Sequence, residues 1–489
     1  MLDTVGEQTV GESIDSIVEL DVGQSDIAIH HCGAGRATAA MLADEVTEGQ
    51  RSVASHNSVY STSVAATADD RELWDPLTQS MPRDELARIA EDGLRNEWTR
   101  IWDMPIPFYR DRFEAAGFGR GAMPPLDEIP RTTKDDLRRN EAELPPFGSH
   151  RSVGIDRAAR IGVTTGTTGK PWMIFYSRAD IDRMIEMQYQ HTWRTELREG
   201  DRFAHSWPGG LYPSAVLGGR HLLQLGILEI PCGPPFSEAQ AAEHVALWDL
   251  LGIDALMTTA SQLQIYDRAA TSIGLDLAEV LDGCVLVFVE ASCQFEGPRR
   301  RVEAAYGVRI HNLSGAAEIP GFVTSDCRFH TGLHAPGGNY RVQVCDPVTG
   351  REVADGERGS LVMSIWGMDA FYLRYDLEDI VVASAGECPC GQTGPRYTLI
   401  GRGADQATVG GKMVLPLDVQ LALDPLGGPE FVLSAGRHDA LKLRVETEGD
   451  GNDYRDAVSH ALGVAVEVEP IPTGTLPRST FKPRRIVAS

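Results

Sequence analysis

The sequence predicts an α/β protein with a large N-terminal domain of βα units plus antiparallel strands and a small C-terminal α+β domain. Between about residues 160 and 400, apolar β-branched runs alternate with helical stretches, which is typical of βα units. Residues 340–344 and 359–363 have the pattern of strands on either side of a Pro/Gly turn, which predicts an antiparallel hairpin. After Gly401, about 88 residues rich in Gly and short apolar runs indicate the small domain. A chain of 489 residues exceeds the size of one hydrophobic core, so two domains are expected.

The domain boundaries are expected near residues 72 and 402. Residues 1–72 are rich in Gly, Ser, Thr, Ala and acidic residues and have almost no aromatics, which predicts a flexible N-terminal extension. A functional segment, or a start codon placed too far upstream, would fit the same composition. The pattern changes at residue 73, and an amphipathic helix is expected soon after it. We therefore assign residues 73–402 to the large domain and residues 403–489 to the small one.

Composition and charge exclude several classes of protein. The formal net charge is −25, from 45 basic and 70 acidic residues. Because nucleic-acid binding needs clustered Lys and Arg, we expect no nucleic-acid partner. No apolar stretch reaches the roughly 18 residues that span a bilayer, so we expect no membrane association. The N-terminus lacks a secretory pattern and the eight cysteines are scattered, which predicts a cytoplasmic protein without a disulfide framework.

The clearest chemical signal is the string TTGTTGKP at residues 164–171. Strands are expected on both sides of it, so the string forms the tip of a hairpin. Its glycines let several N–H groups turn toward one anion, and its Thr hydroxyls and Lys ammonium add further donors. It is not a Walker loop, because the spacing fails and Pro171 follows the lysine. The candidate phosphate contacts are Thr164, Thr165, Gly166, Thr167, Thr168, Gly169 and Lys170.

This string resembles the phosphate loop of the acyl-adenylate-forming superfamily. The segments LWDP, PFYRDRF, IPRTTKDDLR and YSRAD resemble phrases of its phenylacetate-CoA ligase branch, and the resemblance covers about residues 73–489. It implies an acid-CoA ligase. Such an enzyme uses ATP and Mg to convert a small-molecule carboxylic acid into an acyl-AMP. It then transfers the acyl group to coenzyme A and releases AMP and pyrophosphate.

Two further segments resemble the nucleotide-binding motifs of the family. NLSGAAE is similar to N-x-Y-G-x-[ST]-E, which implies that Asn312 meets adenine and that Glu318 holds Mg, with Gly315 as a further candidate nucleotide contact. A carboxylate suits that role, because Mg²⁺ prefers oxygen ligands. RYDLED resembles R-Y-x-x-x-D, which implies that Asp379 binds the ribose hydroxyls. Arg402 is expected to add a second ribose contact.

The C-terminal segment GTLPRSTFK resembles the closing motif G-x-L-P-R-x-x-x-K of the family. It implies that Lys482 is the catalytic lysine, a mobile cation that stabilises charge on the pentavalent phosphorus. The family rotates its small domain between the two half-reactions, about a hinge that falls at Ala404 here. Gly411 matches the glycine that lines the pantetheine tunnel. A mobile small domain is therefore expected.

Trp207 and Tyr212 are the candidate substrate contacts. They fall where the branch places an aromatic wall facing the acyl group, which implies an aryl or arylacetic acid. Ordinary core packing would account for both residues equally well.

A cluster of cysteines and histidines is the candidate metal site. Some members of the branch have a cysteine, a Leu-His pair and the same C-P-C-G, which looks like a structural zinc site. The candidate ligands are Cys327, His334, Cys388 and Cys390, with His330 as the alternative histidine. Four such ligands give closed tetrahedral coordination. Cysteines that bind no metal would give the same sequence pattern.

Two other functions stay open at this level. An enzyme that hands the acyl group to a carrier protein or an amine would carry the same adenylation motifs. An inactive nucleotide-binding regulator would account for three departures from the family pattern, namely Ser314 in place of an aromatic residue, Ala317 in place of a hydroxyl and Ala404 at the hinge. The sequence does not decide which acid is activated, which molecule accepts the acyl group or whether the chain forms a homodimer.

Overall fold

The computed structural model describes residues 72–163, 172–319, 321–336, 338–436, 439–477 and 485–487. These residues belong to one compact unit, Asp69–Ser489. The predicted N-terminal extension lies outside the described residues, apart from Glu72. The predicted phosphate loop and Lys482 lie outside them as well. The domain boundaries at residues 72 and 402 stay predictions.

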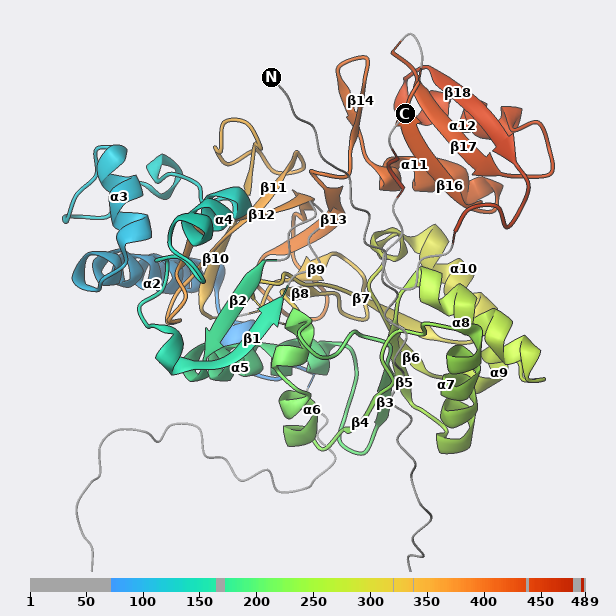
Figure 1. The fold of residues 1–489 in the computed structure, drawn as a ribbon, viewed down its shortest axis with the longest axis horizontal. Helices are drawn as coiled ribbons and strands as arrows, with labels where there is room; N and C mark the ends of the chain where they lie inside the picture. Colours follow the sequence, from blue (N-terminus) through green and yellow to red (C-terminus); the bar gives the residue numbers. More distant parts are fainter. Residues whose placement is uncertain are drawn as a thin grey trace, which may run out of the picture. The chain divides into compact units, whose positions relative to one another are not determined.

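One half of an eleven-stranded sheet is parallel (Figure 1). Its strands are β3 (Arg202–His205), β4 (Leu228–Pro231), β5 (Ala255–Thr258), β6 (Val285–Phe288) and β7 (Arg309–Ser314). The helices between these strands are α6 (Arg220–Gln224), α7 (Glu238–Leu251), α8 (Ala260–Ser272), α9 (Leu277–Leu281) and α10 (Glu296–Tyr306). Every residue of β5 and β6 is buried, as expected of parallel strands covered on both faces. The predicted βα units are confirmed.

The other half of the sheet is antiparallel. Its strands are β8 (Thr324–Ser325), β9 (Leu333–His334), β10 (Tyr340–Cys345), β11 (Arg358–Ile365), β12 (Tyr372–Ala383) and β13 (Arg396–Arg402). The strand order across the whole sheet is β10-β11-β12-β13-β9-β8-β7-β6-β5-β3-β4. Strands β10 and β11 form the predicted hairpin, in which Tyr340 pairs with Ile365 and Cys345 with Ser360. The sheet changes from parallel to antiparallel pairing between β7 and β8, where several candidate site residues lie.

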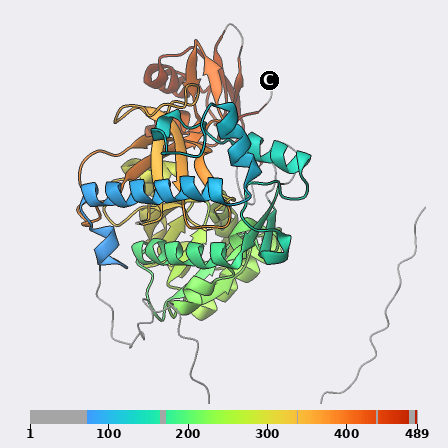
Figure 2. The same ribbon diagram turned by 90° about the vertical axis from the view of Figure 1, so that its left-hand side faces the viewer.

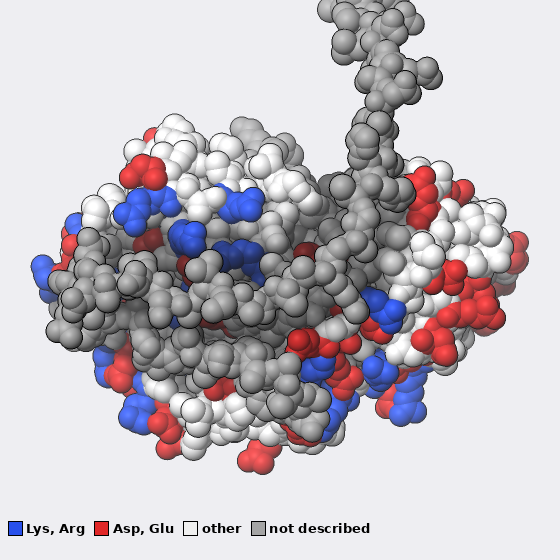
Figure 3. Space-filling model, turned by 90° about the horizontal axis from the view of Figure 1, so that it is seen from below, with Lys and Arg blue, Asp and Glu red and all other residues white. Residues whose placement is uncertain are grey.

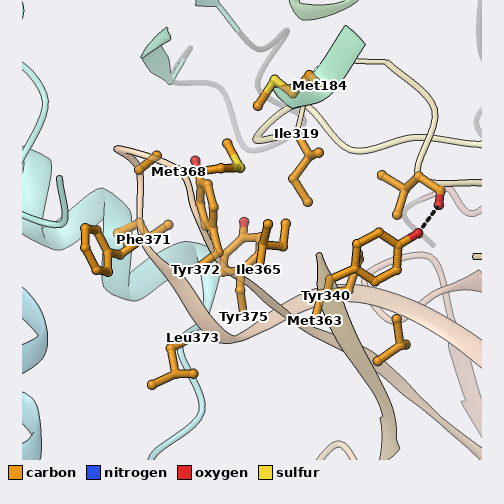
Figure 4. Packing of buried hydrophobic residues seen from close by; sticks show 14 of the residues in the cluster. Met184, Ile319, Tyr340, Met363, Ile365, Met368, Phe371, Tyr372, Leu373 and Tyr375 are labelled. Carbon is orange, nitrogen blue, oxygen red and sulfur yellow. Dashed lines mark hydrogen bonds between the residues drawn. The ribbon is translucent and has the colours of Figure 1, made fainter. Parts of the chain in front are cut away.

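Helices from the N-terminal part of the large domain cover the antiparallel half. They are α1 (Pro76–Gln79), α2 (Arg83–Asp103), α3 (Pro107–Ala115), α4 (Lys134–Glu143) and α5 (Arg178–Arg194). Figure 2 shows α2 lying across these strands, and Trp98 of α2 and Phe113 of α3 belong to the same core as β12. Figure 4 shows Met184 of α5 beside Ile319, in the same core as Tyr372 and Tyr375 of β12. Each fully buried side chain of this size contributes about 1.5–3 kcal/mol, so β12 is held firmly.

The C-terminal segment forms a small α+β unit with its own core. Its main sheet has the order β16-β17-β18, from β16 (Phe431–Ala435), β17 (Leu441–Glu446) and β18 (Val466–Ile471). The other elements are the hairpin of β14 (Ala407–Val409) and β15 (Lys412–Val414) and the helices α11 (Pro416–Leu423) and α12 (Asn452–Leu462). Leu433, Leu443 and Val458 are fully buried in its core. The predicted fold class is thus confirmed, and the mobility of the small domain stays a prediction.

The surface is mixed in charge. Figure 3 shows acidic and basic side chains together on one face, with several Lys and Arg gathered in one area. This face is therefore not uniformly acidic, despite the net charge of −25. Within the part of the chain that the structure describes, no helix combines the length and apolar character needed to cross a membrane.

Candidate functional site

Asn312 lies in β7 and offers an unused hydrogen-bonding group. Its backbone N–H donates to Asp326 Oδ1 at 2.8 Å, and its carbonyl accepts from the Asp326 N–H at 2.8 Å. These two bonds fix the end of β7. Both polar atoms of the Asn312 side chain are buried and have no hydrogen-bond partner among the described residues. Because a buried unsatisfied polar group costs about 1–3 kcal/mol, this amide fits a ligand with a donor and an acceptor.

Gly315 follows β7 at a point where the chain has no room for a side chain. A Cβ atom there would lie 2.6 Å from the carbonyl oxygen of Gly321. A larger residue would have to push the two backbone segments apart. The glycine therefore keeps the loop between Asn312 and Glu318 compact.

Glu318 is a buried carboxylate that is held by a cation. Its Oε1 lies 3.0 Å from Lys134 Nζ and accepts a hydrogen bond from Tyr375 Oη at 2.8 Å. Burial alone would raise the pKa of Glu318, but Lys134 and these hydrogen bonds outweigh burial and lower it. The side chain is therefore a carboxylate at neutral pH, which is the form that binds Mg²⁺.

Lys134 is a site residue that sequence reasoning missed. It is the first residue of α4, where Thr133 and Asp136 form a capping box. Its ammonium also lies 5.9 Å from the ring centroid of Trp172, which closely follows the predicted phosphate loop. Lys134 lies in the segment IPRTTKDDLR, which resembles the branch, but the resemblance assigned no role to this lysine.

Asp379 and Arg402 are neighbours across β12 and β13. The two residues are paired in the strand register, and Arg402 Nε lies 3.5 Å from Asp379 Oδ1. The charge of Asp379 raises the pKa of Arg402, and Asp405, Glu318 and Tyr212 act on it in the same direction. Glu318 is hydrogen-bonded to Tyr375, which lies on the same strand as Asp379, so the candidate Mg ligand and the two candidate ribose contacts gather around β12.

The predicted phosphate loop joins two strands of a separate hairpin. Strands β1 (Ala158–Val163) and β2 (Met173–Ser177) are antiparallel, and Val163 pairs with Met173. The expected hairpin is thus present around the loop. The contacts proposed for Thr164, Thr165, Gly166, Thr167, Thr168, Gly169 and Lys170 lie outside the described residues, as does Lys482.

Trp207 and Tyr212 pack edge to face beside this hairpin. Their ring centroids are 6.3 Å apart, and both residues are half-buried. The Val163 N–H donates to the Leu211 carbonyl at 2.7 Å, which places their segment next to β1. Burial raises the pKa of Tyr212 to about 12, so its hydroxyl is neutral. Half-burial fits both a pocket wall and the edge of a core, so their role stays a prediction.

Gly411 lies in the two-residue turn between β14 and β15. Gly410 and Gly411 have φ values of 57° and 73°, and Val409 pairs with Lys412. Tight hairpin turns of this kind need positive φ at both central positions, which favours glycine. The turn alone accounts for Gly411, and its place in a pantetheine tunnel stays a prediction.

The four candidate metal ligands meet in one place, which we call the Cys/His cluster. One ligand atom from each of Cys327, His334, Cys388 and Cys390 lies within 4.8 Å of the others. His334 Nε2 is 3.6 Å from Cys390 Sγ, whereas His330 Nδ1 is bonded to Asp326 Oδ2 at 2.8 Å. The structure therefore favours His334 over His330 as the histidine ligand.

The Cys/His cluster fits a metal better than a disulfide. Cys327 Sγ and Cys388 Sγ are 3.6 Å apart, far longer than a disulfide bond of about 2.05 Å. Three thiols and one imidazole are the donor set of a structural zinc site. The residues present thus fit Zn²⁺.

The chain is similar to ligases that make coenzyme A thioesters, although no family model matches it. It is 26% identical over 449 residues to phenylacetate-coenzyme A ligase of Thermus thermophilus, covering 83% of this chain and 97% of that protein. It is also 26% identical over 439 residues to phenylacetate-coenzyme A ligase of Escherichia coli, covering 84% and 96%. A crystal structure of 2-hydroxyisobutyryl-CoA ligase with 2-hydroxyisobutyryl-AMP, in the postadenylation state, matches with a TM-score of 0.76 and 25% identity, covering 87% of this chain and 94% of that one.

Proposed function

Because this chain belongs to the acyl-adenylate-forming superfamily and to its phenylacetate-CoA ligase-like branch, we propose that it activates a carboxylic acid with ATP and forms a coenzyme A thioester. The observation that carries the assignment to this site is the buried amide of Asn312, which has no partner among the residues that the structure describes. It lies one short loop away from a buried carboxylate at Glu318. An amide that can both donate and accept suits the edge of adenine.

In the first half-reaction, a carboxylate oxygen of the acid attacks the α-phosphorus of ATP. The bond from that phosphorus to the bridging oxygen breaks, and pyrophosphate leaves with the electron pair. Glu318 would hold a Mg²⁺ ion, which would supply positive charge to the phosphate oxygens. Asp379 and Arg402 hold the ribose, and Lys482 stabilises the charge that develops at phosphorus.

In the second half-reaction, the sulfur of coenzyme A attacks the acyl carbon. The bond between that carbon and the AMP oxygen breaks, AMP leaves and the thiol proton passes to solvent. Rotation of the small domain about Ala404 would bring Gly411 to the pantetheine arm. Hinge residues only have to absorb a backbone change, so the missing acidic residue does not exclude this rotation.

An aryl or arylacetic acid is the substrate class we propose. Trp207 and Tyr212 present two aromatic rings beside β1, the strand that leads into the phosphate loop. Aromatic and apolar walls favour the ring of such an acid over a small polar one. The two rings thus select the acyl group.

We also assign a structural zinc ion to the Cys/His cluster. Its four ligands leave no position open for catalysis, so the ion stabilises the fold rather than the transition state. Metal analysis of the purified protein should find about one zinc per chain. Finding no zinc would contradict this assignment, but it would not contradict the proposed ligase activity.

A panel of carboxylic acids, assayed with and without coenzyme A, tests the proposed function. We expect acid-dependent ATP–pyrophosphate exchange, strongest with aryl or arylacetic acids, and thioester formation when coenzyme A is present. Lys482→Ala should abolish the exchange. Pyrophosphate release without coenzyme A consumption would favour transfer to a carrier protein or an amine. No exchange with any acid would favour a nucleotide-binding regulator.

A further inference from the structure

The last residue of α5 is a buried arginine with no acidic partner. Arg194 is 6% exposed, and no carboxylate lies within ion-pair distance of it in the described part of the chain. A guanidinium keeps its charge at any physiological pH. Burying such a charge is costly unless an opposite charge is close. An anion other than Asp or Glu beside this position would offset that cost.

The hydrogen bonds of Arg194 lead to the Cys/His cluster. Its Nε donates to Gln392 Oε1 at 3.1 Å, and its Nη1 donates to Ser325 Oγ at 2.8 Å and to the His334 carbonyl at 3.3 Å. Within α5, Nη1 also lies 3.3 Å from His191 Nδ1. Ser325 lies two residues before Cys327, and Gln392 lies two residues after Cys390. One guanidinium thus joins the three chain segments that carry the ligands.

The second terminal nitrogen of Arg194 is still available. Arg194 Nη2 is buried and has no hydrogen-bond partner among the described residues. The guanidinium lies against the Cys/His cluster, because its other terminal nitrogen donates to the carbonyl of the candidate ligand His334. A buried free donor beside a candidate metal ligand is the arrangement expected of a cation that serves an anionic centre.

The charge of a loaded cluster supplies the missing anion. Zn²⁺ with three thiolates and a neutral imidazole carries a net charge of −1, and the three thiol protons leave on binding. Asp326 forms no ion pair with Arg194 in the described part of the chain, and it is paired with His330 at 2.8 Å and with His311 at 3.4 Å.

A second arginine, Arg396, acts mainly on the backbone. It donates to the carbonyls of Thr331, Ala385 and Gly386, which lie in the loops around the cluster. These three carbonyls already accept its N–H groups. Arg194 is thus the cation whose position the metal centre explains.

We propose that Arg194 is the counter-charge of the metal centre in the Cys/His cluster. It is a positioning residue that stabilises the anionic, metal-loaded form and links its three ligand segments. The proposal rests on the zinc assignment made above. It also ties the metal to the nucleotide site, because Asp326, next to Cys327, holds the backbone of Asn312 through two hydrogen bonds.

Zinc affinity of the full-length chain, measured by competition with a chelator, tests the proposal. Arg194→Gln keeps amide donors but removes the charge, and it should lower zinc affinity by about 10- to 100-fold. Arg194→Lys keeps the charge and should lose much less. The matched control is Arg374→Gln, since Arg374 is also buried but donates to the Ile129 and Gly350 carbonyls, away from the cluster. Its zinc affinity should equal that of the wild type.

Thermal unfolding adds a readout that a purely structural role would not move. By linkage, Arg194→Gln should lower the unfolding midpoint more for the zinc-loaded protein than for the stripped protein. If Arg194→Gln does not fold, Ser325→Ala removes one anchor of the guanidinium and should lower zinc affinity about five-fold.

Three results would overturn the proposal. They are zinc affinity of Arg194→Gln within about two-fold of the wild type, an equal loss in Arg194→Lys, and equal destabilisation of loaded and stripped protein. A wild-type chain that binds no zinc would instead refute the zinc assignment, and this proposal with it. Neither kind of failure affects acid-dependent ATP–pyrophosphate exchange, which tests the proposed function separately.

Discussion

The proposed nucleotide site, formed by Asn312, Glu318, Asp379 and Arg402, and the Cys/His cluster are built on the same sheet, but they satisfy their charges in opposite ways. In the nucleotide site each carboxylate has its own cation, Lys134 for Glu318 and Arg402 for Asp379. In the Cys/His cluster the ligand atoms face one another within 4.8 Å. The carboxylates of the nucleotide site can exchange their cations for a ligand, whereas the four ligands of the Cys/His cluster enclose a single metal position.

This difference follows from what each site has to do. A site that binds and releases an anionic nucleotide in every cycle has to keep its own charges tolerable when empty, and ion pairs achieve that. A site that holds one metal ion throughout needs no such pairs, because the ion itself neutralises the thiolates. Removing a group from the first site should therefore reduce activity, and removing one from the second should reduce stability.

The largest effect is expected for Glu318→Gln. The substitution keeps the shape of the buried side chain but removes the negative charge that we propose as the ligand of Mg²⁺. Acid-dependent ATP–pyrophosphate exchange should fall by about 10²- to 10³-fold, while the zinc content stays unchanged. Exchange close to that of the wild type would show that another group holds the metal ion.

A large loss of stability is expected for Cys388→Ser. The variant should lose zinc, and its free energy of unfolding should fall by about 3 kcal/mol or more in denaturant titrations. Its ATP–pyrophosphate exchange at low temperature should stay within a few-fold of the wild type. Cys284→Ser is the matched control, since Cys284 is buried and donates to the Ile253 carbonyl at 3.1 Å, outside the cluster. Equal losses in the two variants would mean that Cys388 acts through packing alone.

A smaller effect, with a distinct pH dependence, is expected for Lys134→Met. Burial raises the pKa of Glu318 and Lys134 lowers it, so without the ammonium the pKa should rise. The rate of ATP–pyrophosphate exchange at neutral pH should fall about ten-fold, and the acid limb of the pH profile of this exchange should move to higher pH. The depressed pKa of the wild type stabilises the fold above the ordinary value of 4.5, and this contribution is lost as pH falls through the lowered pKa. An unchanged acid limb would separate Lys134 from the ionisation of Glu318.

The sequence was sufficient for those features that lie within one continuous segment. The βα units, the β10–β11 hairpin and the fold class follow from local patterns, and the structure confirms them. Asn312 and Glu318 are recognisable because one short motif contains both. Asp379 and Arg402 come from two motifs, and only the strand register shows that they are paired.

Partners that come from distant segments could not be predicted. Lys134 reaches Glu318 from the start of α4, and Arg194 reaches three segments from the end of α5. Neither contact leaves a periodicity or a spacing in the sequence. The choice between His330 and His334 likewise depended on Asp326, which binds His330 in a contact that only the folded chain reveals.

The smallest effect is expected for Tyr375→Phe, which removes one hydrogen bond and leaves the core intact. Tyr375 is 1% exposed, and its ring packs among the residues of Figure 4, so phenylalanine fills the same space. Its hydroxyl donates to Glu318 Oε1, and losing that donor should raise the pKa of Glu318 and reduce exchange only a few-fold. Stability should fall by about 1 kcal/mol.

Tyr372→Phe is the matched control for this contact. Tyr372 is equally buried, but its hydroxyl donates to the backbone carbonyl of Glu318 at 3.3 Å instead of to the carboxylate. Both variants should therefore lose similar stability, and only Tyr375→Phe should move the acid limb of the exchange profile to higher pH. Identical profiles would mean that Lys134 alone controls the charge of Glu318. A shift in Tyr375→Phe alone would show that the nucleotide site, unlike the Cys/His cluster, adjusts its charge through single hydrogen bonds.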